Sequence, residues 1–296
     1  MKSQKSRKNL ITAMTVLIAL ALGFFALNGF FATVWNDTSP RLPAVAYLPE
    51  THPTAAGHAQ PSAADNPSAM PAITTTTAPL VQQPVSTKPK VYLTFDDGPS
   101  KNTEEILSIL KMYGARATFF VMDTSYNYIL SDIIGEGHAV GLHTASHNYE
   151  EIYSSEEAFW SDIQKISDVV KDEIGLDVKI MRFAGGGSNA VSRKYSKGIM
   201  TSLTRQAGER GFVYFDWNCD VKDASGDDHS PEDIYFNMVK VADKLKGDIN
   251  VLLHDRADLD STVKALPWII SYFRARGYEF DVITTQTTPI HHKVVN

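Results

Sequence analysis

The sequence contains a single cysteine, Cys219, among its 296 residues. One cysteine excludes an internal disulfide, so the fold must be held together by its own apolar core. Charged side chains are absent between Asn9 and Asn36. No glycine-rich phosphate loop follows the first predicted strand, which argues against an open nucleotide-binding sheet.

The uncharged segment 9–36 is long enough to cross a bilayer, which takes about 20 apolar residues. Four basic residues precede it and every acidic residue follows it. This asymmetry predicts that residues 1–8 stay in the cytoplasm and that the rest lies outside. Its carboxyl-terminal end lacks an Ala-x-Ala cleavage site, so we expect an uncleaved signal-anchor. The sequence thus predicts a single-pass protein of a bacterial cell membrane with an extracellular catalytic domain.

Residues 37–88 are rich in Pro, Thr, Ala and Ser and have no hydrophobic periodicity, which predicts a disordered linker. The remaining residues, 89–296, are enough for one domain with a well-buried core. Beyond residue 36 the chain carries 24 basic and 34 acidic side chains, a net charge of −10. This acidic balance argues against a nucleic-acid partner.

Predicted strands and helices alternate from residue 90 onward, and glycine follows most of the helices. This pattern predicts an α/β fold with a parallel sheet and right-handed crossovers. About seven repeats favour a distorted (β/α) barrel, closed or incomplete, over an open doubly wound sheet. We expect strands at 90–95, 116–121, 138–142, 178–182, 212–215, 249–253 and 279–283, and helices near 102–113, 127–135, 154–174, 191–210, 231–246 and 260–276.

Polar or ionisable side chains stand at the carboxyl-terminal ends of five predicted strands. In barrel enzymes this end of the sheet carries the active site. A single such residue would mean little, whereas five make a chance arrangement improbable. The residues are Asp96 and Asp97, His143 and His147, Arg182, Asp216 with Trp217, and His254.

The segment His143-Thr-Ala-Ser-His147 places two imidazoles four residues apart, a spacing typical of metal ligands. A carboxylate from the first strand would complete a set of two histidines and one carboxylate with open positions for water and substrate. Spacing does not decide whether Asp96 or Asp97 supplies it. The alternative is one capping or core histidine and one exposed histidine.

These segments resemble, in order, the five motifs of the polysaccharide deacetylases, the NodB-homology enzymes of carbohydrate esterase family 4. The resemblance covers about residues 88–285, and the anchor with its linker is similar to those of membrane-anchored peptidoglycan N-acetylglucosamine deacetylases. The matching segments are Thr94-Phe-Asp-Asp-Gly-Pro99, His143-Thr-Ala-Ser-His147, Arg182-Phe-Ala-Gly-Gly186, Asp216-Trp217 and Leu252-Leu-His254.

The resemblance implies that Asp97, His143 and His147 bind a divalent metal, with zinc the expected ion. It implies that Asp96 is the general base that takes a proton from the attacking water. By the same resemblance, His254 is the acid that protonates the departing amine.

Supporting roles also follow from the resemblance. Arg182 is expected to orient the base, and Asp216 is expected to pair with His254 and raise its pKa. Trp217 and Leu252 are expected to line the slot for the acetyl methyl group. A backbone N–H near Gly185 is expected to approach the oxyanion. The family usually has proline at position 184, where this chain has alanine, so the geometry of this loop is a departure from the pattern.

The expected activity is hydrolysis of N-acetyl groups on N-acetylglucosamine residues of a cell-envelope polysaccharide. An anchored domain on a long linker would meet the peptidoglycan glycan strand first, so we expect that polymer as substrate. Chitin oligomers and acetylated xylan are the alternatives within the family. Outside it, the chain could be a glycosidase using the carboxylates of Asp96 and Asp216, or a wall-binding module that has lost catalysis.

Overall fold

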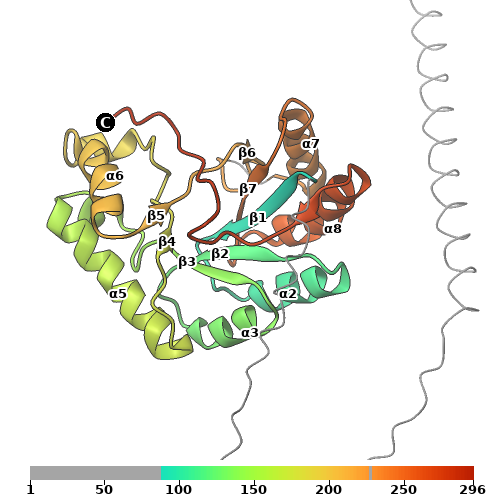
Figure 1. The fold of residues 1–296 in the computed structure, drawn as a ribbon, viewed down its shortest axis with the longest axis horizontal. Coiled ribbons are helices and arrows are strands. Elements are labelled where there is room, and N and C mark those ends of the chain that lie inside the picture. Colours follow the sequence, from blue (N-terminus) through green and yellow to red (C-terminus); the bar gives the residue numbers. More distant parts are fainter. Residues whose placement is uncertain (1–87, 227–228) are drawn as a thin grey trace, which may run out of the picture. The chain divides into compact units, whose positions relative to one another are not determined.

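The computed structural model describes residues 88–226 and 229–296, which form one sheet surrounded by helices (Figure 1). The predicted anchor at 9–36 and nearly all of the predicted linker at 37–88 lie outside the described residues. Within the described ranges, no helix has the length and apolar character needed to span a bilayer.

The sheet has a continuous path of seven strands in the order β5-β4-β3-β2-β1-β7-β6, and β8 pairs with β1 outside this path. All strand pairs are parallel, as predicted. No pairing joins β5 to β6 among the described residues, so the sheet is a half-barrel. The strands are β1 Lys90–Asp96, β2 Ala117–Val121, β3 Ala139–Leu142, β4 Ile180–Met181, β5 Val213–Tyr214, β6 Cys219–Asp220, β7 Ile249–His254 and β8 Glu279–Phe280.

The helices lie on the outer side of this curved sheet (Figure 1). A single helix predicted at 191–210 is instead two pieces, because Gly198 between them has a φ of 77°, outside the helical region. The helices are α2 Thr103–Met112, α3 Leu130–Gly135, α4 Tyr149–Ile152, α5 Glu156–Ile174, α6 Ile199–Glu209, α7 Pro231–Ala242 and α8 Asp260–Ala275, with the 3₁₀ turns η1 Asn127–Ile129 and η2 Val191–Lys194.

Side chains alternate between the two faces of each strand, and this alternation separates the core into two layers. On β1, Leu93 and Phe95 belong to the large cluster that includes the helices. Tyr92 faces the other way, into the half-barrel. There it packs in a small second cluster with Phe120, Ile180, Phe215 and Ile283.

The inner row of β1 continues from Tyr92 through Thr94 to Asp96, and it turns from apolar to polar toward the carboxyl-terminal end. In the β1–β7 ladder, Asp96 stands opposite His254. Residues opposite each other in neighbouring strands share a face of the sheet. The ladder register therefore brings a carboxylate and an imidazole together at the mouth of the half-barrel.

The outer layer should govern stability. Replacing Ile166 on α5, which is fully buried in the large cluster, with alanine should lower the free energy of unfolding by about 2–5 kcal/mol. The neighbouring exposed residue gives a matched control, because Lys165→Ala should change it by less than about 0.5 kcal/mol. Urea denaturation followed by circular dichroism measures both values, and equal losses would contradict the assignment of the buried face.

Candidate active site

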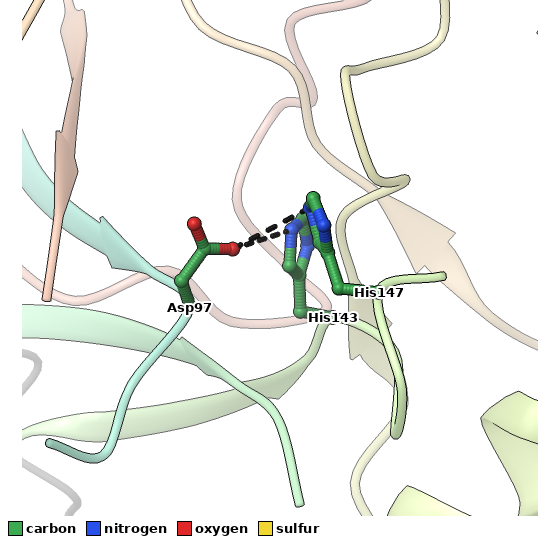
Figure 2. Close-up of side chains that lie close together, drawn as sticks. All are labelled: Asp97, His143 and His147. Carbon is green, nitrogen blue, oxygen red and sulfur yellow. Dashed lines mark ion pairs between the residues drawn. The ribbon is translucent and has the colours of Figure 1, made fainter. Parts of the chain in front are cut away.

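Three candidate metal ligands converge where β1 and β3 end (Figure 2). The Oδ1 atom of Asp97 lies 3.3 Å from Nε2 of His143 and 3.6 Å from Nε2 of His147. All three ligand atoms lie within 4.8 Å of one another. Asp97 follows β1 directly, and the two histidines come from the loop after β3. These two parallel strands flank β2, so the set gathers at one edge of the sheet.

The backbone is strained at two of these ligands. Asp97 has a φ of 71° and His147 a φ of 52°. In the described part of the chain, Lys222 is the one further non-glycine residue with a positive φ. Such conformations are uncommon for residues with a Cβ and concentrate at functional sites. At Asp97 the left-handed turn ends the strand and separates this carboxylate from that of Asp96.

The hydrogen bond of His143 prepares its other nitrogen for a cation. Its Nδ1 lies 2.9 Å from the carbonyl oxygen of Arg182, and because a carbonyl can only accept, Nδ1 must carry the proton. In the neutral ring Nε2 then presents a lone pair toward Asp97. Oδ1 of Asp97 is itself buried without a hydrogen-bond partner among the described residues. A buried acceptor facing a second acceptor is costly unless a cation lies between them.

The electrostatics agree with this interpretation. Burial alone would raise the pKa of Asp97, but His143 and His147 hold it below its ordinary value. Burial alone would lower the pKa of His143, but Asp96 and Asp97 raise it. Both shifts reflect the mutual attraction between the carboxylates and the imidazoles. Two imidazoles and one carboxylate form a donor set that suits a divalent transition metal and leaves positions open, so the residues fit the metal expected from the sequence.

Buried carboxylates hold the loops that carry these ligands. Asp162 on α5 accepts hydrogen bonds from the backbone N–H groups of Ala145, at 2.6 Å, and Ser146, at 3.4 Å. Asp255 accepts from the hydroxyls of Ser100, at 2.7 Å, and Thr103, at 2.6 Å, in the turn after Asp97. Each carboxylate thus fixes a ligand-bearing loop to the body of the domain.

Arg182 is fully buried, and its guanidinium contacts Asp96. Its Nη1 donates to Oδ1 of Asp96 at 2.8 Å and to the hydroxyl of Thr94 at 2.7 Å. Asp96 is 3% exposed, and its Oδ2 has no hydrogen bond within the described residues. The arrangement holds one oxygen of Asp96 and leaves the other available.

The rest of the guanidinium is also matched to acceptors. Its Nε donates to the carbonyl of Phe215 at 3.0 Å, and Nη2 donates to the carbonyl of Asp216 and the side chain of Asn250. Its central carbon lies 4.2 Å from the ring centroid of Phe120, a distance typical of cation–π contact. The structure therefore places Arg182 beside Asp96, and its role toward that residue stays a prediction.

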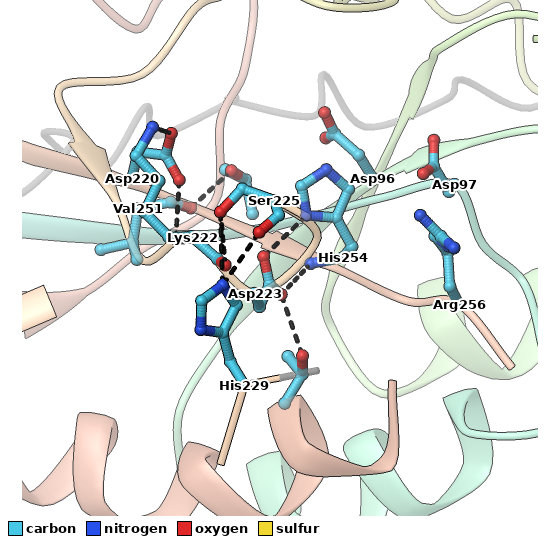
Figure 3. Close-up of polar contacts among 12 residues, drawn as sticks. Asp96, Asp97, Asp220, Lys222, Asp223, Ser225, His229, Val251, His254 and Arg256 are labelled. Carbon is cyan, nitrogen blue, oxygen red and sulfur yellow. Dashed lines mark hydrogen bonds and ion pairs between the residues drawn. The ribbon is translucent and has the colours of Figure 1, made fainter. Parts of the chain in front are cut away.

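His254 pairs with Asp223, a residue that the sequence analysis did not select (Figure 3). Nδ1 of His254 lies 2.8 Å from Oδ1 of Asp223, and the backbone N–H of His254 donates to Oδ2. Burial alone would lower the pKa of His254, but the hydrogen bond and charge of Asp223 outweigh it and raise this pKa to about 9. The opposite edge of the ring faces Asp96 and Asp97 (Figure 3).

The predicted pairing of Asp216 with His254 is thus wrong. Asp216 is fully buried, and it accepts hydrogen bonds from the backbone N–H groups of Gly187 and His292, each at 2.7 Å. It links the loop after β4 to the carboxyl-terminal segment. With both oxygens held by backbone amides, Asp216 is also unsuited to the glycosidase alternative, which needs a carboxylate that reaches substrate.

The loop that begins at Arg182 is held by side chains where the family has proline. The carbonyl of Ala184 accepts hydrogen bonds from the hydroxyl of Tyr153, at 2.7 Å, and the amide of Asn189, at 2.9 Å. Gly185 then turns with a φ of 75° and is exposed. These two hydrogen bonds restrain the backbone at Ala184.

Trp217 and Leu252 lie near the site, and their predicted roles in substrate binding stay predictions. The ring of Trp217 packs against Gly186 and lies 5.7 Å from the central carbon of Arg182. Leu252 is 4% exposed on β7 and stands opposite Thr94 of β1.

Asp223 was not selected in the sequence analysis because β6, the strand before it, has only two residues and therefore no detectable periodicity.

The chain is similar in sequence and in fold to known polysaccharide deacetylases. A family model for polysaccharide deacetylases matches residues 84–200. Two peptidoglycan-N-acetylglucosamine deacetylases of Bacillus cereus are 32% and 31% identical, over 66% and 64% of this chain and 86% and 67% of their own. The catalytic domain of a peptidoglycan N-acetylglucosamine deacetylase from Eubacterium rectale superposes with a TM-score of 0.68 at 39% identity, over 72% of this chain and 96% of that domain. A Bacillus cereus polysaccharide deacetylase gives 0.59 at 27%, over 70% and 96%.

The partner of His254 can be tested by substitution. In the metal-free protein, Asp223→Asn should lower the pKa of His254 from about 9 toward or below its ordinary value of about 6.5, because the burial remains and the opposing charge is lost. At pH 7 the wild-type ring is then mainly protonated and the variant ring is not. Asp216→Asn is the matched control and should leave this pKa near 9. NMR titration of the imidazole measures both, and a shift in the Asp216 variant alone would contradict the pairing.

Proposed function

We propose, since the chain belongs to the polysaccharide deacetylase family, that it removes N-acetyl groups from N-acetylglucosamine residues of peptidoglycan by metal-dependent hydrolysis. The observation that carries the proposal is the buried, unpartnered Oδ1 of Asp97 facing two imidazoles. The relatives from Bacillus cereus and Eubacterium rectale, whose names specify this sugar and this polymer, support the choice of substrate.

Asp97, His143 and His147 would hold the metal, and zinc suits the combination of two nitrogen ligands and one oxygen ligand. Such an ion polarises the acetamide carbonyl and makes water a stronger nucleophile. These three ligands are held in position without the metal. The carbonyl of Arg182 fixes the ring of His143, and Asp162 fixes the loop between the two histidines.

Asp96 would take the proton of the attacking water on its Oδ2. Oδ1 is occupied by Arg182, which orients the carboxylate and balances its charge. The water oxygen forms a bond to the carbonyl carbon while its proton moves to Asp96. Because the orientation of Asp96 depends on a fully buried guanidinium, the base is fixed before substrate arrives.

His254 would supply the proton to the departing nitrogen. With its pKa raised to about 9 by Asp223, the ring keeps both protons at neutral pH. Nδ1 is bonded to Asp223, so Nε2 is the nitrogen on the side of Asp96 and Asp97 (Figure 3). When the C–N bond breaks, the proton on Nε2 passes to the amine, and acetate and a free amino sugar leave.

The proposal includes a location, which rests on the sequence alone. The uncharged segment 9–36 would anchor the chain in the cell membrane, and the linker 37–88 would carry the catalytic domain to the glycan strands outside. Chitin oligomers and acetylated xylan remain alternative substrates, and one xylanase/deacetylase is among the relatives, 27% identical over 66% of this chain.

Acetate release from purified peptidoglycan tests the function. The protein should release acetate, lose this activity after chelation, and regain it when zinc is added, because the donor set needs a cation to act. His143→Ala should lower the rate by at least about 100-fold. Release that survives chelation would contradict the metal mechanism. Release from chitin or xylan oligomers but not from peptidoglycan would keep the chemistry and overturn the substrate.

A further inference from the structure

Tyr149 lies at the border of the candidate metal site without belonging to any of the five motifs. It is the first residue of α4, two positions after His147. Its ring centroid lies 5.3 Å from that of His147. A Cβ atom added to Gly185 would lie 2.5 Å from the hydroxyl oxygen of Tyr149. The hydroxyl therefore occupies space that any residue other than glycine at position 185 would fill.

The hydroxyl of Tyr149 makes no hydrogen bond within the described residues, in contrast to the hydroxyl of Tyr153. Tyr153, which packs edge-on against Tyr149, donates its hydroxyl to the Ala184 carbonyl. Tyr149 makes no hydrogen bond through its oxygen to any described residue, although its ring is half-buried. A tyrosine hydroxyl, with an ordinary pKa of about 10, is a neutral donor at working pH. It is thus available to a ligand.

Gly185 adds a second donor at the same place. The residue is exposed, and its backbone N–H has no acceptor among the described residues. The preceding carbonyl, that of Ala184, is fixed by Tyr153 and Asn189. The peptide between Ala184 and Gly185 is therefore held in one orientation. Two donors, one hydroxyl and one amide, lie side by side next to the histidine loop.

We propose that Tyr149 is a substrate-contacting residue whose hydroxyl donates a hydrogen bond to the acetamide oxygen as that oxygen gains negative charge, beside the N–H of Gly185. The inference rests on the proposed deacetylation. As the water oxygen bonds to the carbonyl carbon, the electron pair of the C=O double bond moves onto the oxygen. Tyr149 keeps its proton throughout and stabilises that charge, which is greatest in the transition state.

Tyr149→Phe removes the hydroxyl alone. We expect kcat/KM for acetate release from an N-acetylglucosamine oligomer to fall about 10- to 100-fold, mostly in kcat, with KM changed less than about twofold. Zinc content after dialysis should equal that of the wild type, because Tyr149 is not a ligand. The control is Tyr113→Phe, since Tyr113 follows α2 at the opposite end of the sheet, and its kinetics should match the wild type.

A binding measurement separates this role from a structural one. A methylphosphonamidate analogue of the oligomer imitates the tetrahedral, charged oxygen, whereas the deacetylated oligomer lacks that oxygen. By calorimetry, Tyr149→Phe should weaken binding of the analogue by about the same factor as kcat/KM. Binding of the deacetylated oligomer should be unchanged.

A second variant tests the position of the hydroxyl. Gly185→Ala should lower kcat in the wild-type background, because the new methyl group collides with the Tyr149 oxygen. In the Tyr149→Phe background the same substitution should cost less, because the colliding oxygen is gone and the backbone strain of the positive φ is what remains.

The outcomes are distinguishable. An active wild type with an equally active Tyr149→Phe variant would overturn the inference and leave the proposed function standing. An effect confined to KM would also overturn it, because that would place the hydroxyl on a part of the sugar that does not change during reaction. A wild type that releases no acetate from any polymer and binds no analogue would overturn the proposed function, and the inference with it.

Discussion

The site is organised by one buried cation, the guanidinium of Arg182. A charge without solvent is tolerated inside a protein when its donors are matched by acceptors. Here the acceptors come from three segments of the chain: Thr94 and Asp96 on β1, the carbonyls of Phe215 and Asp216 after β5, and Asn250 on β7. The network that satisfies the arginine thus also draws both sides of the half-barrel together. The orientation of Asp96 follows from it, so the geometry of the proposed base and the stability of the sheet depend on the same bonds.

A second layer of support comes from buried aspartates that each hold one loop. Asp162 binds the backbone between the two histidines, Asp216 binds Gly187, Asp223 binds His254, and Asp255 binds the turn after Asp97. A carboxylate has several acceptor sites and prefers N–H or O–H partners when water is excluded. Each of these carboxylates therefore ties a loop to the body of the fold. Such support keeps the candidate catalytic groups in place before substrate binds, which is what electrostatic preorganisation requires.

Much of the fold could be predicted because it follows from local signals. Apolar runs such as Val91 to Phe95, separated by helices that end near glycine, predicted seven of the eight parallel strands. The two-residue strand β6 was not predicted. The sequence left open whether the barrel closes, because closure depends on whether β5 and β6 pair across the fold. The break at Gly198 also escaped, since a glycine within a helical pattern is often tolerated. These failures concern long-range pairing and backbone conformation, which periodicity does not report.

The sequence by itself determined the family and the candidates for the metal ligands, the base and the acid. Asp96, Asp97, His143 and His254 stand at strand ends, and His147 follows His143 by four residues. Only the tertiary structure decided how these groups are supported. Asp216 and Asp223 each follow a strand of two residues, and nothing local shows which of them will reach an imidazole. The ladder between β6 and β7 brings one of them to His254. The other is enclosed by backbone amides from the loop after β4 and from a segment 76 residues further along the chain. A role that depends on such distant neighbours is fixed by packing in three dimensions, not by local sequence.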